Sequence, residues 1–233
     1  MENPVSQLPE PVTADRSDPS VSMPGKASHP IRLLLVRHGA GVGSEQGRFF
    51  GRTDVELSPR GEAQMREAGA RLAPWLDGGG EIRCFTSPLR RARRSSLLLR
   101  EELGLEPPGE GEVVEGLSEL DLGKWEGETY ASLSAKEPER LRAHYADFVR
   151  SRPPGGESLQ DLALRVRRAL RRLREKMAGK NIMVMAHAGV NRVILCDALG
   201  VPLENFFRIE QDFAALNIIE YHGERPLVRL VNG

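Results

Sequence analysis

Four side chains that could bind and transfer an anionic group stand at three comparable places in the sequence. Arg37 and His38 directly follow an apolar run, Arg91 lies shortly after a second run, and His187 directly follows a third. An imidazole can act as a nucleophile, and a guanidinium offers a bidentate fork to phosphate or carboxylate. If the fold brings these groups together, two cations and two imidazoles form an anion site, for which phosphate is the favoured ligand.

The apolar runs themselves predict the strands that would position these groups. Residues 31–36 and 182–186 are nearly unbroken apolar runs, typical of strands buried on both faces of a parallel sheet, and residues 82–86 predict a further short strand. Helical patterns lie between them, which predicts an α/β fold: a three-layer α/β/α sandwich around a mostly parallel sheet. Because ligands bind past the carboxyl ends of such strands, the Arg and His side chains that follow them should converge.

Helix starts can be located from Ser-Pro pairs and apolar stripes. Ser58-Pro59 and Ser87-Pro88 each have the cap and first-turn signature of a helix, and Gly78-Gly79-Gly80 is expected to end the first of these helices. From Ser158 onward an amphipathic stripe predicts a long helix whose Arg residues face water. The other predicted elements are a brief strand at 113–114, a helix at 190–199 and two closing strands at 213–221 and 227–231.

Composition divides the chain into two parts. Residues 1–29 contain Pro, Ser and Asp and little that is apolar, so they are expected to form a disordered tail. Residues 30–233 are expected to form one domain. Within it, residues of about 131–150 have weak helical periodicity and predict a helical lid.

Charge and cysteine usage indicate a cytoplasmic protein with a small-molecule partner. Lys+Arg and Asp+Glu both number 33, so net charge favours neither nucleic acid nor an anionic membrane as a partner. No apolar run approaches the length of a membrane span. Cys84 and Cys196 lie in apolar segments and are expected to be buried, reduced thiols.

Two nucleotide-binding signatures can be excluded in the loop after the first strand. Glycines at 39, 41 and 43 follow that strand, but the third glycine of a G-x-G-x-x-G pattern would fall at Ser44 or Gln46. No Gly-Lys-Ser/Thr completes a P-loop. No Cys, His or carboxylate cluster has metal-ligand spacing either, so neither a metal nor another cofactor is expected.

Six motifs, in this order along the chain, resemble those of the histidine phosphatase superfamily, whose fold is also called phosphoglycerate-mutase-like. They are Arg37-His38-Gly39, the segment 51–61, Ser87-Pro88-Leu89-Arg90-Arg91-Ala92, the segment 117–127, Pro154-Gly155-Gly156-Glu157-Ser158 and Ala186-His187-Ala188-Gly189. The resemblance covers roughly residues 31–221. Matching six separate motifs in order is far more specific than matching one short pattern.

The resemblance implies a role for each matched residue. His38 would attack phosphorus and become phosphohistidine, and Glu119 would act as general acid and then as general base. Arg37, Arg91 and His187 would bind the phosphate group and stabilise its charge. The protein's own cations would supply the positive charge, without a metal.

Some positions depart from the family pattern or carry no expected role. Ala40 and Gly41 stand where the family usually has Glu or Gln followed by Ser or Thr, which concerns substrate specificity more than phosphoryl transfer. Ser44 stands where Asn is common; because a hydroxyl can also donate to a phosphate oxygen, Ser44 is assigned to phosphate binding. Asp121 and Glu126 are expected to be surface carboxylates.

The segment 117–127 favours one branch of this family. It resembles the phosphatase branch, including α-ribazole phosphatases, whereas the mutase branch usually has Arg-His-Tyr after the acid. A phosphomonoesterase that acts on a small phosphorylated metabolite is therefore expected. The alternatives are a bisphosphoglycerate-dependent phosphoglycerate mutase and a phospho-ligand-binding protein without turnover. The sequence indicates neither the particular substrate nor the oligomeric state.

Overall fold

The structure is a computed structural model that describes residues 30–76, 81–177 and 180–233. The predicted tail, residues 1–29, and the glycines at 78–80 lie outside these residues. No helix in the described part of the chain is both long enough and apolar enough to cross a membrane.

A six-stranded sheet forms the centre of the described structure, with the strand order β3-β2-β4-β1-β5-β6. The strands are β1 (Ile31–Arg37), β2 (Ile82–Thr86), β3 (Glu112–Val113), β4 (Asn181–Ala186), β5 (Leu216–His222) and β6 (Arg225–Leu230). The first four pair in parallel, and β5 and β6 add an antiparallel edge next to β1. The mostly parallel sheet predicted from the sequence is confirmed.

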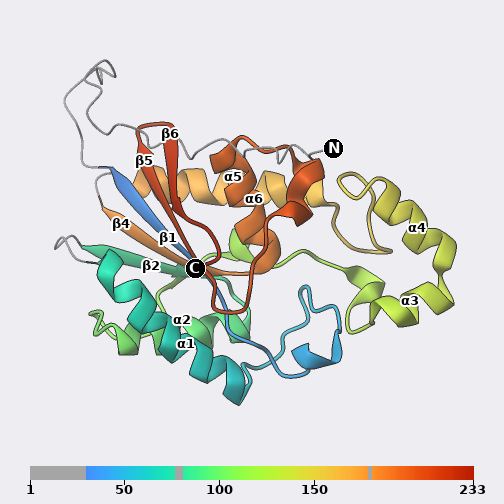
Figure 1. Cartoon of the computed structure of the whole chain (residues 1–233), viewed down its shortest axis with the longest axis horizontal. Helices are drawn as coiled ribbons and strands as arrows, with labels where there is room; N and C mark the ends of the chain where they lie inside the picture. The colour runs from blue at the N-terminus through green and yellow to red at the C-terminus, as the bar shows by residue number, and fades with distance from the viewer. Residues whose placement is uncertain (1–29, 77–80, 178–179) are drawn as a thin grey trace, which may run out of the picture.

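Successive residues of a strand point to opposite faces, and both faces of this sheet are covered by helices. Leu33 and Leu35 of β1 pack in one buried cluster with α5 (Leu159–Lys176) and α6 (Ala188–Leu199). On the other face, Leu34 and Val36 belong to a cluster with α1 (Pro59–Leu72) and α2 (Arg90–Glu102). Figure 1 shows the two pairs of helices on opposite sides of the strands, so the three-layer architecture is confirmed.

Side-chain caps fix the starts of α1 and α5 as predicted. The amide of Gly61 donates to the Ser58 hydroxyl at 3.1 Å, and Ser158 forms a reciprocal capping box with Asp161. The predicted start of the next helix at Ser87-Pro88 is wrong, because α2 begins at Arg90 with Leu89 as its cap. The Ser87 hydroxyl is instead engaged with His187 and the amide of Leu89.

The segment predicted to be a helical lid contains two short helices, α3 (Tyr130–Lys136) and α4 (Pro138–Ala146). They lie apart from the sheet, at the right of Figure 1, and pack on the side chain of Trp125 through Leu133 and Leu141. Short 3₁₀ segments complete the described structure: η1 (Ser44–Gln46), η2 (Ala73–Trp75), η3 (Glu115–Leu117), η4 (Gly123–Trp125) and η5 (Leu203–Arg208).

Several element boundaries differ from the prediction, including the second closing strand, which is Arg225–Leu230 rather than 227–231. The brief strand is residues 112–113 rather than 113–114, and α6 begins two residues early, at Ala188. The first closing strand begins at Leu216 rather than at Phe213. Phe213 leaves the sheet because its ring lies against the Arg37 guanidinium, with the guanidinium carbon 4.0 Å from the ring centroid.

Candidate active site

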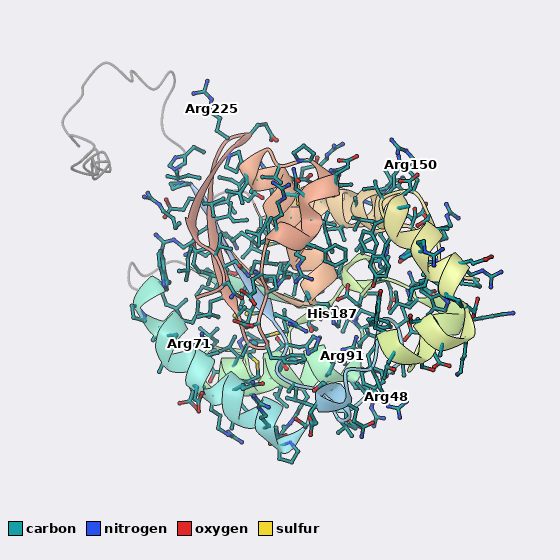
Figure 2. The ribbon with its side chains drawn as sticks, turned by 45° about the vertical axis from the view of Figure 1, so that its right-hand side comes forward. Arg48, Arg71, Arg91, Arg150, His187 and Arg225 are labelled. Atoms are coloured by element: carbon teal, nitrogen blue, oxygen red, sulfur yellow. The ribbon has the colours of Figure 1, made fainter. Side chains whose placement is uncertain are left out.

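The parallel pairing of neighbouring strands brings the predicted site residues together. Strand β4 lies between β1 and β2, so the chain segments that follow these three strands meet at one edge. The rings of His38 and His187 lie 4.9 Å apart in an edge-to-face arrangement. Arg91, in the first turn of α2, places its Nε 3.3 Å from His38 Nε2. Arg91 and His187 are labelled near the centre of Figure 2.

His38 is a neutral imidazole whose Nε2 carries no proton. Its Nδ1 lies 2.6 Å from the carbonyl oxygen of Gly39, which can only accept, so Nδ1 carries the proton and Nε2 keeps its lone pair. Burial lowers the pKa of His38 well below its ordinary value, and the nearby Arg91 and Arg37 lower it further. A neutral ring with an available Nε2 has the form that a nucleophile requires.

Arg91 is fixed by the backbone of the loop that faces it. Its side chain is almost fully buried, and its terminal nitrogens donate to the carbonyls of Thr53 at 2.8 Å and Gly51 at 2.7 Å. Three of its nitrogens are thus held, with Nε directed at His38. The guanidinium is therefore held in a fixed position beside His38.

Arg37 keeps one buried donor without a partner. Its Nη1 donates to the carbonyl of Gln211, whereas its Nε is buried and has no partner among the described residues. Burial lowers the pKa of Arg37 to about 10, so the group remains charged at neutral pH. Buried N–H groups are normally satisfied, so this donor is available to a group bound in the site.

His187 is fully buried, and its Nε2 lies 2.6 Å from the Ser87 hydroxyl oxygen, which also accepts from the amide of Leu89. When the Ser87 hydroxyl donates to Nε2, the proton of the neutral ring is on Nδ1, a buried atom without a partner among the described residues. Burial lowers the pKa of His187 well below its ordinary value, and the positive charge of the nearby Arg91 lowers it further. The ring can therefore present a neutral N–H donor.

Glu119 is the acid of its segment that faces the cavity. Its Oε2 accepts from the amide of Gly189 at 3.0 Å, and its Oε1 accepts from Leu120 at 2.9 Å. Asp121 does not line that cavity; its Oδ1 accepts from the amide of Gly123. The structure thus brings Glu119, and not Asp121, to the wall that holds His38.

Ser44 also reaches the cavity wall, at the start of η1. Its hydroxyl donates to the carbonyl of Gly41 at 2.8 Å, within the same loop. The structure therefore places Ser44 near the other residues, while its part in phosphate binding stays a prediction.

A cavity of about 290 Å³ extends from these groups towards α4 and η5. Arg37, His38, Arg91 and Glu119 lie at one end, and aromatic side chains with Arg192 line the rest. No three His, Cys, Asp or Glu side chains in the described residues are grouped so that they could hold a metal ion.

The prediction that the Arg residues of α5 face water is wrong for Arg174, whose side chain is only 17 % exposed, and for Arg165. Only 19 % of the Arg165 side chain is exposed, and it forms an ion pair with Glu157 at 2.9 Å. It also donates to the carbonyls of Ser118 at 2.6 Å and Glu119 at 2.8 Å. Arg165 thus holds the backbone of the acid segment against α5, which an amphipathic stripe cannot reveal.

The prediction that Glu126 is a surface carboxylate is also wrong. Its carboxylate accepts from the amides of Gly51 at 2.9 Å, Arg52 at 2.7 Å and Thr53 at 3.1 Å, and from the Thr53 hydroxyl at 2.6 Å. The carbonyls of the same loop hold Arg91. Glu126 therefore positions Arg91 through the loop 51–53. Glu126 lies in the motif at residues 117–127, but the spacing of that motif does not indicate that Glu126 positions Arg91.

Replacing Glu126 with glutamine is expected to weaken both stability and turnover. The amide keeps the shape but turns one acceptor into a donor that faces backbone N–H groups. Charge-assisted bonds of this kind contribute about 1.5–3 kcal/mol each, so we expect a loss of about 2–4 kcal/mol in unfolding free energy. We expect kcat/KM to fall by about 10–100-fold as Arg91 loses its fixed position. Denaturant titration and steady-state kinetics measure the two effects.

Glu128→Gln is the matched control for Glu126→Gln. Glu128 is in the same region, but its carboxylate pairs with Lys136 and Ser132 and does not contact the loop 51–53. This control should keep wild-type kinetics, because exposed ion pairs contribute little. If both variants lost activity equally, the positioning role of Glu126 would be wrong.

Stability should fall as the pH drops below about 6.5, because His38 and His187 are buried in the neutral form. In the unfolded chain each takes up a proton near its ordinary pKa, whereas the folded pKa of each lies well below it. The unfolded state then binds more protons, so each residue removes up to about 1.4 kcal/mol of unfolding free energy per pH unit until its folded pKa is reached. Denaturant titrations at pH 7.0, 6.0 and 5.5 measure this slope.

His187→Asn, which removes one of these two titrating groups, is expected to reduce that slope by less than half, because His144, whose pKa burial also lowers, keeps its contribution. An unchanged slope would contradict the neutral burial of His187.

The arrangement defines a phosphate-transfer class of protein with a histidine nucleophile, and comparison with known families agrees. The family model described as histidine phosphatase superfamily (branch 1) matches residues 33–233. The chain belongs to this superfamily, and the family expected from the six motifs is confirmed.

Three relatives show the spread within the family. The chain is 34 % identical to a bifunctional protein of Mycobacterium tuberculosis, over 96 % of this chain but only 60 % of that protein. It is 29 % identical to phosphoserine phosphatase 1 of Hydrogenobacter thermophilus, covering 87 % of this chain and 92 % of that protein. The solved α-ribazole phosphatase of Shigella flexneri is 26 % identical, with a TM-score of 0.76 over 87 % of this chain and 96 % of that structure.

Proposed function

We propose that this chain is a phosphomonoesterase that hydrolyses a small phosphorylated metabolite through a phosphohistidine on His38. The observation that carries the proposal is the neutral, buried His38, whose Nε2 faces Arg91 Nε at 3.3 Å in a cluster with Arg37 and His187. A nucleophile inside a cluster of cations and N–H donors suits attack on a phosphate group. The names of the phosphatase relatives support hydrolysis as the reaction.

In the first step His38 Nε2 attacks phosphorus and the bond from phosphorus to the ester oxygen breaks. Glu119 gives its proton to the leaving oxygen, because an alkoxide is a poor leaving group. The Nδ1–H of His38 stays bonded to the Gly39 carbonyl, which stabilises the positive charge that the ring gains. In the second step Glu119 takes a proton from water, the water oxygen attacks phosphorus, and the bond from phosphorus to Nε2 breaks.

The remaining groups stabilise the charge on the phosphate oxygens. Arg37 Nε and His187 Nδ1, which are buried and have no partner among the described residues, would donate to these oxygens. Arg91 Nε, which donates to His38 Nε2 in this structure, would turn to an oxygen when the ring attacks. No step requires a metal, because the protein supplies the positive charge.

The direct test is a panel of phosphorylated metabolites assayed for phosphate release, with isomerisation of 3-phosphoglycerate followed in parallel. We expect phosphate release from at least one ester and no isomerisation. Isomerisation that exceeded hydrolysis would favour the mutase alternative, and the absence of both would favour a binding protein.

Phosphate release is expected to persist in excess EDTA. No group of metal-binding side chains occurs in residues 30–76, 81–177 and 180–233, and the charge on the phosphate is met by Arg and His. Rates measured before and after dialysis against the chelator should agree within about twofold. Loss of activity that a divalent ion restored would contradict this mechanism.

We further propose that the protein acts in the cytoplasm. Cys84 and Cys196 are buried and free, as expected for a reducing compartment.

A further inference from the structure

We propose that the leaving-group end of the cavity binds a flat aromatic ring, so that the substrate is the phosphate ester of an alcohol that carries a neutral or anionic aromatic group. This inference rests on the proposed function, since it assumes that the phosphate lies at His38. The cavity runs from His38 to a wall contributed by three separate segments. Six rings form this wall: Trp125, His144, Tyr145, Phe148, Phe206 and Phe207.

The rings make one continuous wall from the lid segment to η5. Phe148 lies at its centre, with its ring centroid 4.5 Å from that of Phe207 and 6.0 Å from that of Phe206. Tyr145 stacks on Phe148 at 6.0 Å with an angle of 12° between the ring planes. Such a wall favours a ligand with a π face, because aromatic pairs gain about 0.5–1.5 kcal/mol beyond the area that they bury.

Two of these rings are exposed to solvent, unlike the buried rings of a hydrophobic core. Tyr145 is 44 % exposed and Phe207 is 57 % exposed, although both line the cavity. Large apolar side chains that stay open to solvent beside a binding site commonly mark a contact surface for a ligand. A ring bound against them would cover this surface.

The charges of the wall restrict the ring further. The guanidinium carbon of Arg192, on α6, lies 5.4 Å from the Phe206 ring and 5.9 Å from the Phe207 ring. Its Nε donates to the carbonyl of Ile209 at 2.7 Å, while its terminal nitrogens have no hydrogen bond to another described residue. The guanidinium can therefore stack on a ring and donate to a polar substituent.

Cations outnumber carboxylates along the cavity. Arg48 and Arg192 line the part beyond the phosphate end, and Glu119 is the one carboxylate among the lining residues of the described structure. Because Glu119 must stay close to the leaving oxygen, the distal wall offers no carboxylate to pair with a cationic ring, and the charge of Arg192 would repel one. The preferred ring is therefore neutral or anionic.

Phosphonates test this subsite without turnover, since their carbon–phosphorus bond resists hydrolysis. We would measure binding to the wild-type protein by calorimetric titration with 3-phenylpropylphosphonate, hexylphosphonate and propylphosphonate. Two further phenyl compounds, 2-phenylethylphosphonate and 4-phenylbutylphosphonate, vary the length of the linker by one methylene. The best phenyl compound should bind about 10–100-fold more tightly than propylphosphonate, the gain expected from burying a phenyl ring. It should also bind more tightly than the hexyl compound, which is apolar but has no π face.

Three alanine variants locate the subsite. Phe207→Ala and Tyr145→Ala should each reduce the phenyl-to-propyl affinity ratio by about 5–10-fold. Leu164→Ala is the matched control, because Leu164 is 61 % exposed in α5 and does not line this cavity. Its ratio should equal that of the wild type. The proposal is overturned by a wild-type ratio within threefold of one, by equal binding of the hexyl compound, or by an equal loss in the control.

Hydrolysis of 3-phenylpropyl phosphate and propyl phosphate separates this inference from the proposed function. Their leaving alkoxides have nearly equal basicity, so the ratio of their kcat/KM values reports how the leaving group is bound. Phosphate release from both esters without preference overturns the aromatic subsite alone. Selective phosphonate binding without phosphate release from any ester overturns the proposed function and leaves the subsite standing.

Discussion

Replacing His38 with alanine is expected to remove essentially all phosphate release while the protein still folds. The methyl group has no lone pair, so no phosphoenzyme can form. Loss of a covalent nucleophile commonly lowers kcat by several orders of magnitude, and we expect a fall of more than about 10⁴-fold. Labelling with ³²P-substrate followed by quenching in base should show a base-stable, acid-labile adduct in the wild type and none in the variant.

Two controls distinguish loss of the nucleophile from loss of structure. Circular dichroism and denaturant titration should show that His38→Ala is folded. His222→Ala removes the histidine that ends β5, which does not line the cavity, and should keep wild-type turnover. If His38→Ala kept a rate within about tenfold of the wild type, only about 1.4 kcal/mol of barrier would depend on His38, and the covalent mechanism would be wrong.

The convergence of His38, Arg91 and His187 could be predicted because it follows from the geometry of parallel strands. A strand buried on both faces is visible as an apolar run, and the residue after it lies at the edge where neighbouring strands also end. The order β2-β4-β1 then brings the three side chains together.

The groups that hold these side chains could not be predicted, since their partners are backbone atoms far away in the sequence. Glu126 binds amides of the loop 51–53, and Arg165 binds carbonyls of residues 116, 118 and 119. Backbone groups are the same at every residue, so no pattern of side chains marks them. On the sequence alone, Glu126 and Arg165 are indistinguishable from solvated charges.

Local sequence patterns also gave wrong predictions where a side chain contacts the site rather than its own helix or strand. Ser87 has the signature of a helix cap, but its hydroxyl orients His187 and the helix begins later. Phe213 continues an apolar strand pattern, but its ring packs on Arg37. Arg192 belongs to the helix predicted at 190–199, but the sequence pattern predicts no role for its side chain, which lies beside the Phe206 ring in the cavity wall. In each case a tertiary contact at the site outweighs the local preference.

Glu119→Gln is expected to slow the two half-reactions in different ways, which tests the proposed acid and base directly. The amide keeps the length of the side chain but transfers no proton. Phosphorylation of His38 by alkyl phosphates should slow by about 10²–10⁴-fold, the usual contribution of general acid catalysis. Phosphorylation by p-nitrophenyl phosphate should slow much less, because p-nitrophenolate leaves without a proton. Hydrolysis of the phosphoenzyme should slow equally for both substrates, since both share that step.

Rapid-quench kinetics can separate the two half-reactions, and Asp121→Asn is the matched control in the same segment. Asp121 caps the amide of Gly123 and does not line the cavity, so this variant should keep the wild-type dependence on the leaving group. Glu119 accepts two backbone N–H bonds, of which the amide can satisfy one without repulsion, so unfolding must be measured for both variants. A folded Glu119→Gln variant that slowed phosphorylation equally for both leaving groups would show that Glu119 is not the acid. Its carboxylate would then only orient the amide of Gly189 and the start of α6 next to His187.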